Sequence, residues 1–304
     1  MSQSSAPARA NGGREYAAPQ AEQITFEAAD GWPLAGDLHR GEDPRAAILI
    51  SAGTGFPKRF YRRVAAYFAA RGAVVLTFDY RGIGDSAKGD PARRDIEYAD
   101  WGRLDQTAAL DALAAAAPGL PITHLCHSVG GHFIGLMPNH ERIDRHAFVA
   151  VGSGYWRHHR WDYKPVALYF WWVLGSINLG LWGYMRTGGG WTGEALPRNV
   201  FATWRRWAHR RDYLRRDLET NFGPHRYDEV AAPIRAWLFA DDPIANERSA
   251  PGILDNYPNA PKTLTMVAPD DVGVRRIGHE GAFRAGREAL WDRWWRWLAD
   301  GEEA

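Results

Sequence analysis

Short apolar runs alternate with amphipathic stretches along most of the chain. Continuous apolar runs bounded by turn residues are typical of strands that are buried on both faces of a sheet. We expect such strands at residues 46–51, 73–78, 122–126, 147–151, 234–240 and 263–267. Helices are predicted between several of them, at residues 60–70, 104–117 and 130–137. This alternation predicts an α/β fold with a mostly parallel central sheet and helices on both faces.

The first residues of the chain show a different pattern. Residues 24–38 alternate weakly and are interrupted by the turn dipeptide Asp30-Gly31, which predicts a β-hairpin. Residues 1–20 are rich in Ser, Ala, Gly and Pro, and no apolar run follows their two arginines. We therefore expect a disordered tail there and no secretory signal.

The alternation of strands and helices stops between residues 153 and 227. Eight of the 15 tryptophans lie in this stretch, at positions 156, 161, 171, 172, 182, 191, 204 and 207. We interpret it as a Trp-rich helical cap inserted into an α/β core that comprises residues 21–152 and 228–304. The cap is expected to cover the ligand-binding edge of the sheet.

Composition narrows the classes of protein that remain. The 304 residues include 37 Lys and Arg against 36 Asp and Glu, which gives a formal charge of +1. That balance excludes a globally basic nucleic-acid-binding protein and an acidic disordered chain. The single cysteine excludes an internal disulfide and a multi-cysteine metal site, and it suits a reducing compartment. A cytoplasmic location is expected.

Candidate chemistry appears in the segment Cys-His-Ser-Val-Gly-Gly, between a predicted buried strand and a predicted short helix. A nucleophile on such a turn has a strained backbone that raises its side chain above the sheet. The strain requires small residues two positions before and after it, which Cys126 and Gly130 supply. Ser128 is therefore the candidate nucleophile, and the N–H of Val129 is a candidate oxyanion donor. His127 is expected to pack behind the turn without a chemical role.

This segment resembles the G-x-S-x-G elbow of α/β-hydrolases. Residues 79–86 resemble the D-x-R-G-x-G-x-S loop of the serine aminopeptidase and monoacylglycerol lipase-like branch of that superfamily. Residues 51–57 stand where that branch has a His-Gly oxyanion turn. The resemblance extends from about residue 24 to 299, and it is closest to uncharacterised bacterial α/β-hydrolases that share the Gly-Tyr-Trp segment at residues 154–156. It implies the α/β-hydrolase fold with a cap insertion.

The resemblance also indicates the other two members of a catalytic triad. Residues 241–244 (Asp-Asp-Pro-Ile) resemble the acid loop of the family, with Asp242 in the position of the acid and Asp241 as the adjacent alternative. Residues 277–281 (Ile-Gly-His-Glu-Gly) resemble its G-H-x-G loop and make His279 the expected base. The order of serine, acid and histidine along the chain is that of α/β-hydrolases.

The second oxyanion donor depends on which of two alignments is chosen. If Ala52-Gly53 stands for the His-Gly pair of the family, the donor is Thr54; if Thr54-Gly55 does, the donor is Phe56. We expect Thr54. Loss of one such donor typically lowers the rate by ~10²–10³-fold.

Two segments of the predicted cap allow alternative interpretations. Residues 165–184 carry no charge and could cross a bilayer. One crossing would place Ser128 on the opposite side of the membrane from Asp242 and His279, so we expect no membrane span. We expect instead a pair of apolar helices in the core of the cap; peripheral contact with lipid is the alternative. Residues 198–216 contain seven Arg and one acid. Their aromatic spacing favours an amphipathic helix with a charged outer face over a nucleic-acid-binding segment.

These residues predict a serine hydrolase that acts on a small ester or related acyl substrate through an acyl-enzyme. The aromatic cap favours an apolar or aromatic acyl or alcohol portion. No metal ion or organic cofactor is implied, and nothing in the cap indicates capture of a peptide amino terminus. Two alternatives stay open: an acyltransferase that uses the same acyl-enzyme, and a non-catalytic small-molecule binder, which the missing His-Gly pair would favour.

Overall fold

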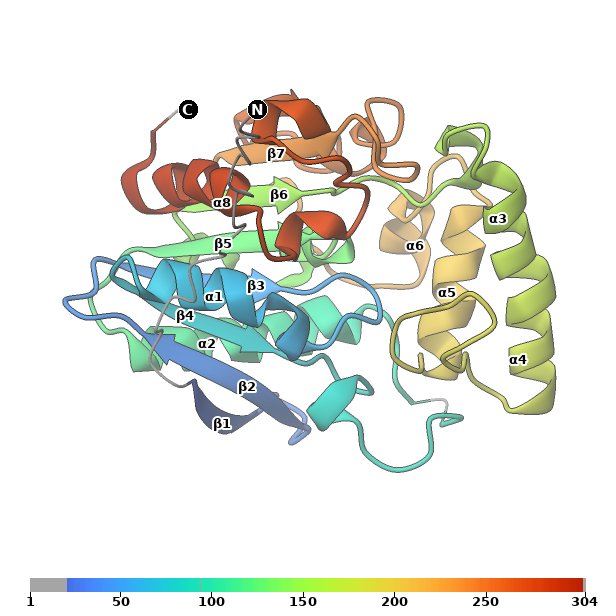
Figure 1. Ribbon diagram of the computed structural model, residues 1–304. Coiled ribbons are helices and arrows are strands. Elements are labelled where there is room, and N and C mark those ends of the chain that lie inside the picture. The colour runs from blue at the N-terminus through green and yellow to red at the C-terminus, as the bar shows by residue number, and fades with distance from the viewer. Residues whose placement is uncertain (1–20, 94, 303–304) are drawn as a thin grey trace, which may run out of the picture.

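Eight strands form a single sheet in the order β1-β2-β4-β3-β5-β6-β7-β8, as Figure 1 shows for the computed structural model. The structure describes residues 21–93 and 95–302, so the predicted tail at residues 1–20 lies outside the described residues. The strands are β1 (Glu22–Glu27), β2 (Pro33–Arg40), β3 (Ala46–Ser51), β4 (Ala73–Phe78), β5 (Ile122–His127), β6 (Arg145–Val149), β7 (Ile234–Phe239) and β8 (Lys262–Val267).

Most neighbouring strands of the sheet run parallel. β1 and β2 form the predicted hairpin, and β2 also pairs antiparallel with β4. The pairs from β4-β3 through to β7-β8 are parallel. The mostly parallel sheet predicted from the alternation of elements is confirmed. Because parallel strands end at one edge, the loops that follow β5, β7 and β8 meet on the same side of the sheet.

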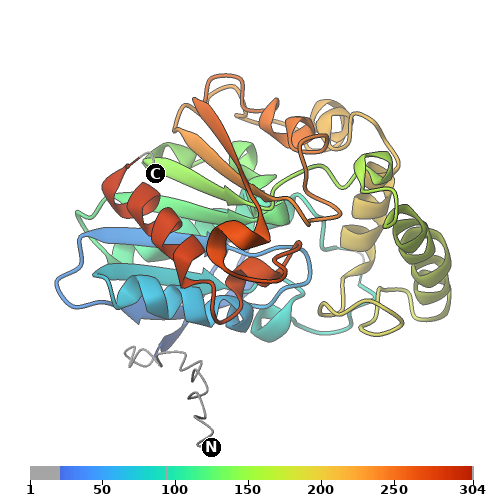
Figure 2. The ribbon, with the colours of Figure 1, turned by 45° about the horizontal axis from the view of Figure 1, so that its top comes forward.

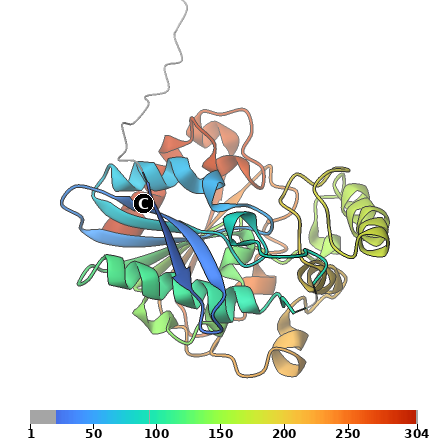
Figure 3. The ribbon, with the colours of Figure 1, turned by 90° about the horizontal axis from the view of Figure 1, so that it is seen from below.

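Helices cover both faces of this sheet. α1 (Arg62–Ala69) and α8 (Glu288–Trp295) lie against one face, and α2 (Thr107–Ala116) lies against the other (Figures 1 and 3). A short helix, α7 (Pro251–Leu254), precedes β8. β3, β4, β5 and β7 are buried along their whole length, as their continuous apolar runs predict.

The helix predicted at residues 130–137 is wrong. Two 3-10 turns, Ser128–Gly131 and Ile134–Leu136, stand in its place. Three glycines and the following proline disfavour an α-helix in this stretch. Gly135 is also required for packing, since a Cβ there would lie 2.3 Å from the Tyr227 ring. The segment after Ser128 therefore lacks the dipole of a full α-helix.

A long inserted segment connects β6 to β7. β6 ends two residues before the predicted residue 151 because Ala150 turns the backbone with a φ of 53°. The segment contains α3 (Lys164–Leu168), α4 (Gly175–Leu181), α5 (Arg198–Ala208) and α6 (Arg215–Thr220). These helices lie beyond the carboxyl ends of the strands (Figures 1 and 2). The division of the chain into core and cap at residues 153 and 227 stays a prediction.

The apolar part of the inserted segment is one helical run and not the predicted pair of helices. α3 continues through a π-helical turn (Tyr169–Leu174) directly into α4. Gly175 lies inside this run and does not end it. Glycine is required there because a Cβ would lie 2.4 Å from the Phe201 ring. Among the helices that the structure describes, none combines the length and the apolar character needed to cross a membrane.

The basic part of the inserted segment also differs from prediction. The single helix expected over residues 198–216 is interrupted between α5 and α6, where Tyr213 has a φ of 49°. The interruption lets the chain fold back, so that the buried Asp217 accepts hydrogen bonds from Arg206, from the Trp207 indole at 2.7 Å and from Arg210 at 2.9 Å. Two of the seven arginines, Arg206 and Arg210, therefore form ion pairs with Asp217.

Candidate active site

Ser128 stands directly after β5, where the backbone turns sharply. Its φ of 49° lies in the left-handed region, which is unusual for a residue with a side chain and fits the strained strand-to-turn elbow that presents a nucleophile. A Cβ at Gly130 would lie 2.4 Å from the Ser51 carbonyl oxygen, so glycine is required there. The local sequence thus raises the Ser128 side chain above the carboxyl edge of the sheet.

The fold brings Ser128, His279 and Asp242 together from three separate loops. Ser128 Oγ and His279 Nε2 are 3.0 Å apart, and His279 Nδ1 and Asp242 Oδ2 are 2.8 Å apart. Because a carboxylate accepts hydrogen bonds, Nδ1 carries the ring proton and Nε2 is left to accept from the Ser128 hydroxyl. This arrangement allows the imidazole to take the hydroxyl proton.

The two adjacent aspartates of the acid loop face different partners. Asp242 is buried, and its Oδ1 also accepts two backbone N–H groups of its own loop, at 2.8 and 3.1 Å. Asp241 instead accepts the backbone N–H groups of Ile277 and Gly278, each at 2.9 Å. Asp242 therefore contacts the imidazole, whereas Asp241 holds the loop that carries it.

The electrostatic surroundings of His279 favour its protonated form. Burial alone would lower the pKa of His279, but the Asp242 carboxylate and, more weakly, Glu280 raise it above its ordinary value. A more basic imidazole accepts a proton from a hydroxyl group more readily, although it must be neutral at the start. The basicity of the His279 ring therefore depends on the Asp242 charge.

The turn between β3 and α1 lies beside the cavity that contains Ser128. Thr54, Phe56 and Val129 line the same cavity as Ser128. The Phe56 N–H already donates to the Gly53 carbonyl oxygen at 3.1 Å, within a tight turn. The Thr54 hydroxyl is hydrogen-bonded to the Tyr98 hydroxyl, which anchors this turn. Which of the two N–H groups serves as the second oxyanion donor stays a prediction.

A chain of hydrogen bonds, which the sequence did not reveal, links this turn to the loop that carries His279. The Gly53 N–H donates to the Tyr61 hydroxyl at 2.9 Å, and that hydroxyl lies 2.7 Å from His127 Nδ1. His127 Nε2 donates to the His279 carbonyl oxygen at 3.0 Å. Burial lowers the pKa of His127 to about 3, so the ring is neutral. His127 does pack behind the elbow, as expected; no local pattern could have identified Tyr61 as its partner.

The Asp-Tyr-Arg-Gly-Ile-Gly-Asp-Ser loop acts as a support. Asp79 accepts the backbone N–H groups of Lys58 at 2.6 Å and of Asp85 at 2.9 Å, and the Lys58 ammonium pairs with the Asp85 carboxylate. A Cβ at Gly84 would lie 2.5 Å from the Asp79 carboxylate, so this loop needs glycine at that position. These contacts hold the turn that carries Thr54.

A cavity of about 300 Å³ opens at Ser128 between the sheet edge and the inserted segment. Its core side includes Ser128 and His279, together with the turn around Thr54. The inserted segment supplies an aromatic wall, to which Tyr163, Phe170, Trp171, Trp191, Trp204 and Tyr213 contribute. Apolar walls with a few polar groups are typical of sites for small organic molecules.

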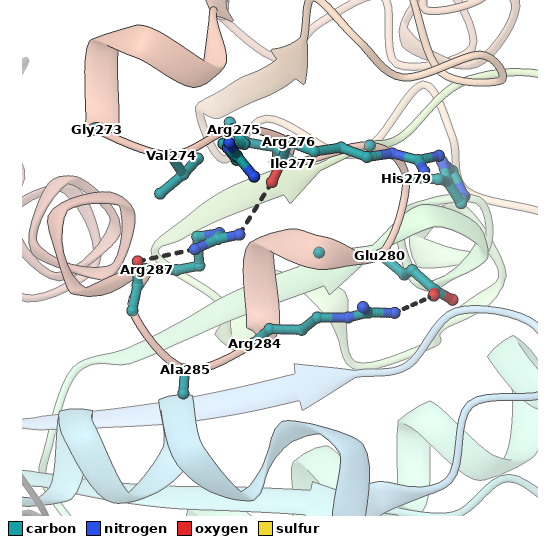
Figure 4. Close-up of a pocket in the computed structure, with 13 residues that line it drawn as sticks. Gly273, Val274, Arg275, Arg276, Ile277, His279, Glu280, Arg284, Ala285 and Arg287 are labelled. Carbon is teal, nitrogen blue, oxygen red and sulfur yellow. Dashed lines mark hydrogen bonds and ion pairs between the residues drawn. The ribbon is translucent and has the colours of Figure 1, made fainter. Parts of the chain in front are cut away.

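A larger cavity of about 970 Å³ is lined by the loop that carries His279. Figure 4 shows two of its arginines held within the loop: Arg284 pairs with Glu280 at 2.6 Å, and Arg287 donates to the Arg276 carbonyl oxygen at 2.9 Å. Arg276 extends toward His279 and lines both cavities. Ser128 does not line this larger cavity, whereas His279 lines both.

One set of described side chains could hold a metal ion. The ligand atoms of His124, Cys126 and His146 lie within 4.8 Å of one another, and all three residues are buried. His124 and His146 are register partners on β5 and β6, and His124 Nε2 lies 2.7 Å from Ser51 Oγ. None of the three lines the cavity next to Ser128, so an ion held there would lie outside the site.

A family model described as serine aminopeptidase, S33, matches residues 42–201, which is more than half of the chain. The chain belongs to this family. The resemblance carried by the elbow and by the Asp-x-Arg-Gly loop is thereby confirmed. The range matched by the S33 model contains Thr54 and Ser128, whereas Asp242 and His279 lie beyond it.

Solved structures confirm the α/β-hydrolase fold of this S33 family member. A soluble variant of monoglyceride lipase from Saccharomyces cerevisiae, in complex with a substrate analog, is 15% identical over 95% of this chain and 98% of that chain, with a TM-score of 0.66. A thermostable carboxyl esterase from Bacillus coagulans is 14% identical over 93% and 98%, with a TM-score of 0.62. A hypothetical protein from Pseudomonas aeruginosa is 17% identical over 99% of both chains, with a TM-score of 0.61. No curated protein matches the chain.

Proposed function

We propose that the protein hydrolyses a carboxylic ester, with Ser128 as the nucleophile, His279 as the general base and Asp242 as the partner of the base. The observation that carries this proposal is the unbroken chain of hydrogen bonds from the Ser128 hydroxyl through the His279 ring to Asp242. A serine hydroxyl is a weak nucleophile near neutral pH, so it needs such a base. The esterase and the lipase among the similar structures support the choice of an ester.

The reaction would proceed in two halves. Ser128 Oγ attacks the carbonyl carbon while its proton passes to His279 Nε2, and Asp242 stabilises the imidazolium. The intermediate collapses, the bond to the alcohol oxygen breaks, and His279 returns the proton to that oxygen, which leaves an acyl ester on Ser128. Water then loses a proton to His279 and attacks the acyl carbonyl carbon. The second intermediate releases the carboxylic acid, and the proton returns to Ser128 Oγ.

The backbone N–H groups of Val129 and Thr54 are the proposed donors to the negative oxygen of each intermediate. Both residues line the cavity beside Ser128, and the Phe56 N–H is already engaged in its own turn. Donors fixed before the reaction stabilise the developing charge without reorganising, which is why they contribute strongly to catalysis. The Thr54 turn is itself fixed by the Gly53 N–H bond to Tyr61 and by the Thr54 contact with Tyr98.

The substrate that we propose is a small ester with an apolar or aromatic portion. The aromatic wall of the cavity supports this choice, because burial of apolar area stabilises a bound ligand by roughly 25 cal/mol per Å² before the costs of association.

We also propose that the helical run at residues 164–181 rests on an anionic lipid surface. One broad side of this run is exposed and apolar, with Val166, Tyr169, Trp172, Val173, Ile177 and Leu181. Its opposite side includes Trp171, which is buried and lines the cavity. An apolar side of this size on a helix marks an interaction surface.

The charges around this apolar side indicate an anionic bilayer as its partner. Residues 163–193 contain no Asp or Glu. The guanidinium of Arg205 lies 5.7 Å from the Trp172 ring centre, and that of Arg186 lies 4.6 Å from the Trp182 ring centre. Tryptophan favours the headgroup level of a bilayer, and arginine is attracted to anionic lipids. The apolar side and its arginines therefore match both features of such a surface.

Labelling with a fluorophosphonate, followed by a panel of p-nitrophenyl esters of increasing acyl length, tests the proposed reaction. We expect the wild-type protein to be labelled and to hydrolyse the esters, and the Ser128→Ala protein to do neither. Absence of labelling in a folded wild-type protein would favour the non-catalytic binder. Ester products formed in the presence of added alcohol, with little free acid, would favour the acyltransferase.

A further inference from the structure

Arginines dominate the charged lining of the larger cavity beside His279. Its described lining includes four arginines and one acidic residue: Arg275, Arg276, Arg284, Arg287 and Glu280. Arg284 is paired with Glu280, and Arg287 donates to the backbone carbonyl oxygens of Gly286 and Arg276. Within the described part of the chain, the guanidinium groups of Arg275 and Arg276 have neither an ion pair nor a hydrogen bond. Two positive charges of this cavity are therefore not neutralised by a described acidic side chain.

Arg276 is the arginine that reaches the reaction site. It lines both the larger cavity and the cavity that contains Ser128, which none of the other three arginines does. Its side chain extends toward His279 (Figure 4) and lies beside the backbone of Gly278, where a Cβ would be 3.6 Å from the Arg276 Nε. Gly278 has a φ of 61°, a conformation that favours glycine. The local backbone thus places an exposed guanidinium at the boundary between the two cavities.

The chemistry of this boundary suits a carboxylate. A guanidinium presents a planar fork of N–H donors, which can donate to both oxygens of one carboxylate. The unpaired positive charge of the larger cavity also attracts an anion toward the reaction site. Glu280 is the only acidic residue among the described residues of either cavity, and Arg284 already binds it at 2.6 Å. A carboxylate of a ligand therefore meets no unpaired acidic side chain among them.

We propose that Arg276 determines specificity by binding a carboxylate at the far end of the substrate, so that the preferred substrate is an ester that carries one negative charge in addition to its ester bond. The ester carbonyl lies at Ser128, the apolar portion lies against the aromatic wall, and the carboxylate lies at Arg276, with Arg275 adding attraction from the larger cavity. This inference rests on the proposed ester hydrolysis at Ser128 and names the charge of the substrate for it.

Matched esters test the inference. One pair compares p-nitrophenyl hexanoate with mono-p-nitrophenyl adipate, in which a carboxylate replaces the terminal methyl group of the acyl portion. The other pair compares pentyl butyrate with 4-carboxybutyl butyrate, which makes the same change in the alcohol portion. At low ionic strength we expect kcat/KM to be about tenfold higher for the carboxylate member of one pair, which identifies the portion that reaches Arg276. The preference should shrink in about 1 M NaCl, where the screening length is about 3 Å.

Arg276→Met removes the guanidinium and keeps much of the aliphatic stem. We expect it to abolish the preference for the carboxylate ester, mainly through KM, whereas Arg276→Lys should keep part of the preference because the charge remains and only the fork is lost. Arg63→Met, at an exposed arginine of α1 outside both cavities, is the matched control and should keep the full preference. Fluorophosphonate labelling of Ser128 reports that each variant is folded.

The outcomes separate this inference from the reaction on which it rests. Values of kcat/KM that are equal within both pairs, or higher for the uncharged esters, would overturn the inference and leave ester hydrolysis intact. A preference for the carboxylate ester that survives Arg276→Met would contradict the role of Arg276. Absence of hydrolysis of every ester by the wild-type protein would contradict the reaction itself.

Discussion

The loops at the carboxyl edge of the sheet and the inserted segment above them are built in different ways. Ser128 and the Asp242 loop follow directly after strands, and hydrogen bonds to the backbone hold both the acid loop and the base loop. The inserted segment is held mainly by rings packed on rings, as where Trp171 meets Trp204 with centroids 4.7 Å apart. Hydrogen bonds fix angles tightly, whereas aromatic packing mainly fills volume. The first region suits chemistry, and the second suits recognition.

The two regions meet at the Thr54 turn. The Glu194 N–H donates to the Gly55 carbonyl oxygen at 2.8 Å, and a Cβ at Gly55 would lie 2.4 Å from the Trp191 ring. Tyr98, which is bonded to the Thr54 hydroxyl, stacks on Trp207 with centroids 5.2 Å apart. A substitution in the inserted segment can therefore reach the proposed oxyanion donors without touching Ser128.

The strongest test of the comparison is the loss of the nucleophile. Ser128→Ala should lower kcat for ester hydrolysis by about 10⁵–10⁶-fold, because no other group can form the acyl-enzyme. Ser153→Ala, at another buried serine near the same edge of the sheet, should leave kcat almost unchanged. Similar losses in both variants would contradict the role of Ser128. Stopped assays on hydrolysis of a p-nitrophenyl ester measure both.

The two aspartates provide the next largest contrast. Asp242→Asn should lower kcat by about 10⁴-fold, because the amide cannot hold the imidazole in the required tautomer or stabilise its charge. Asp241→Asn should cost far less, since it weakens only the contacts with the N–H groups of Ile277 and Gly278. Steady-state kinetics on both variants checks this order, and a larger loss in Asp241→Asn would reverse the assignment.

Loss of a buried aspartate in the inserted segment should lower the stability of the protein and leave the reaction at Ser128 intact. Asp217→Ala leaves the guanidinium groups of Arg206 and Arg210 and the Trp207 indole without their acceptor, and should lower the free energy of unfolding by about 2–3 kcal/mol. Glu229→Gln, which breaks an exposed pair with Arg226, should cost less than about 1 kcal/mol. Denaturant titration measures both, and fluorophosphonate labelling of Ser128 should survive in each.

The exposed apolar side of the helical run at residues 164–181, which we propose rests on lipid, predicts a smaller but separable effect. The double substitution of Trp172 and Leu181 by Ser should reduce co-sedimentation with phosphatidylserine vesicles by at least about tenfold, because two apolar side chains lose their burial. Leu264→Ser, at an exposed apolar residue of β8, is the control and should bind normally. Equal binding by all three proteins would show that this side does not contact the lipid. A wild-type dimer that the double substitution dissociates would show that a second copy of the chain covers this side.

The dependence of kcat/KM on pH should reflect the ionisation of His279 in the core and not a group of the inserted segment. His279 must be neutral to accept the proton, and the Asp242 charge raises its pKa, so kcat/KM should fall with decreasing pH with a midpoint above the ordinary value of 6.5. In Asp242→Asn the midpoint should move to lower pH, because the stabilising charge is lost. A profile of kcat/KM against pH measures both midpoints. An unchanged midpoint would show that another group sets the profile.

Sequence reasoning succeeded where the signal was local and failed where it depended on distant contacts. The continuous apolar run of β3 and the small residues around Ser128 report their own conformation, because buried strands and strained turns accept few residue types. The helix expected at residues 130–137 is an exception, because its three glycines and the following proline are local signals against a helix; only the contact between Gly135 and Tyr227 depends on a distant part of the chain. The single helix expected at residues 198–216 failed because Asp217 folds back onto α5.

By itself, the sequence determined the mostly parallel sheet, the sharp turn at Ser128 and the order of the candidate residues along the chain. Only the tertiary structure decided that Asp242, and not Asp241, contacts His279, and that Tyr61 and His127 connect the Thr54 turn to the loop that carries His279. The physical reason is range. Periodicity and turn strain act over a few neighbouring residues, whereas the direction of a hydrogen bond depends on which distant side chains packing brings within about 3 Å.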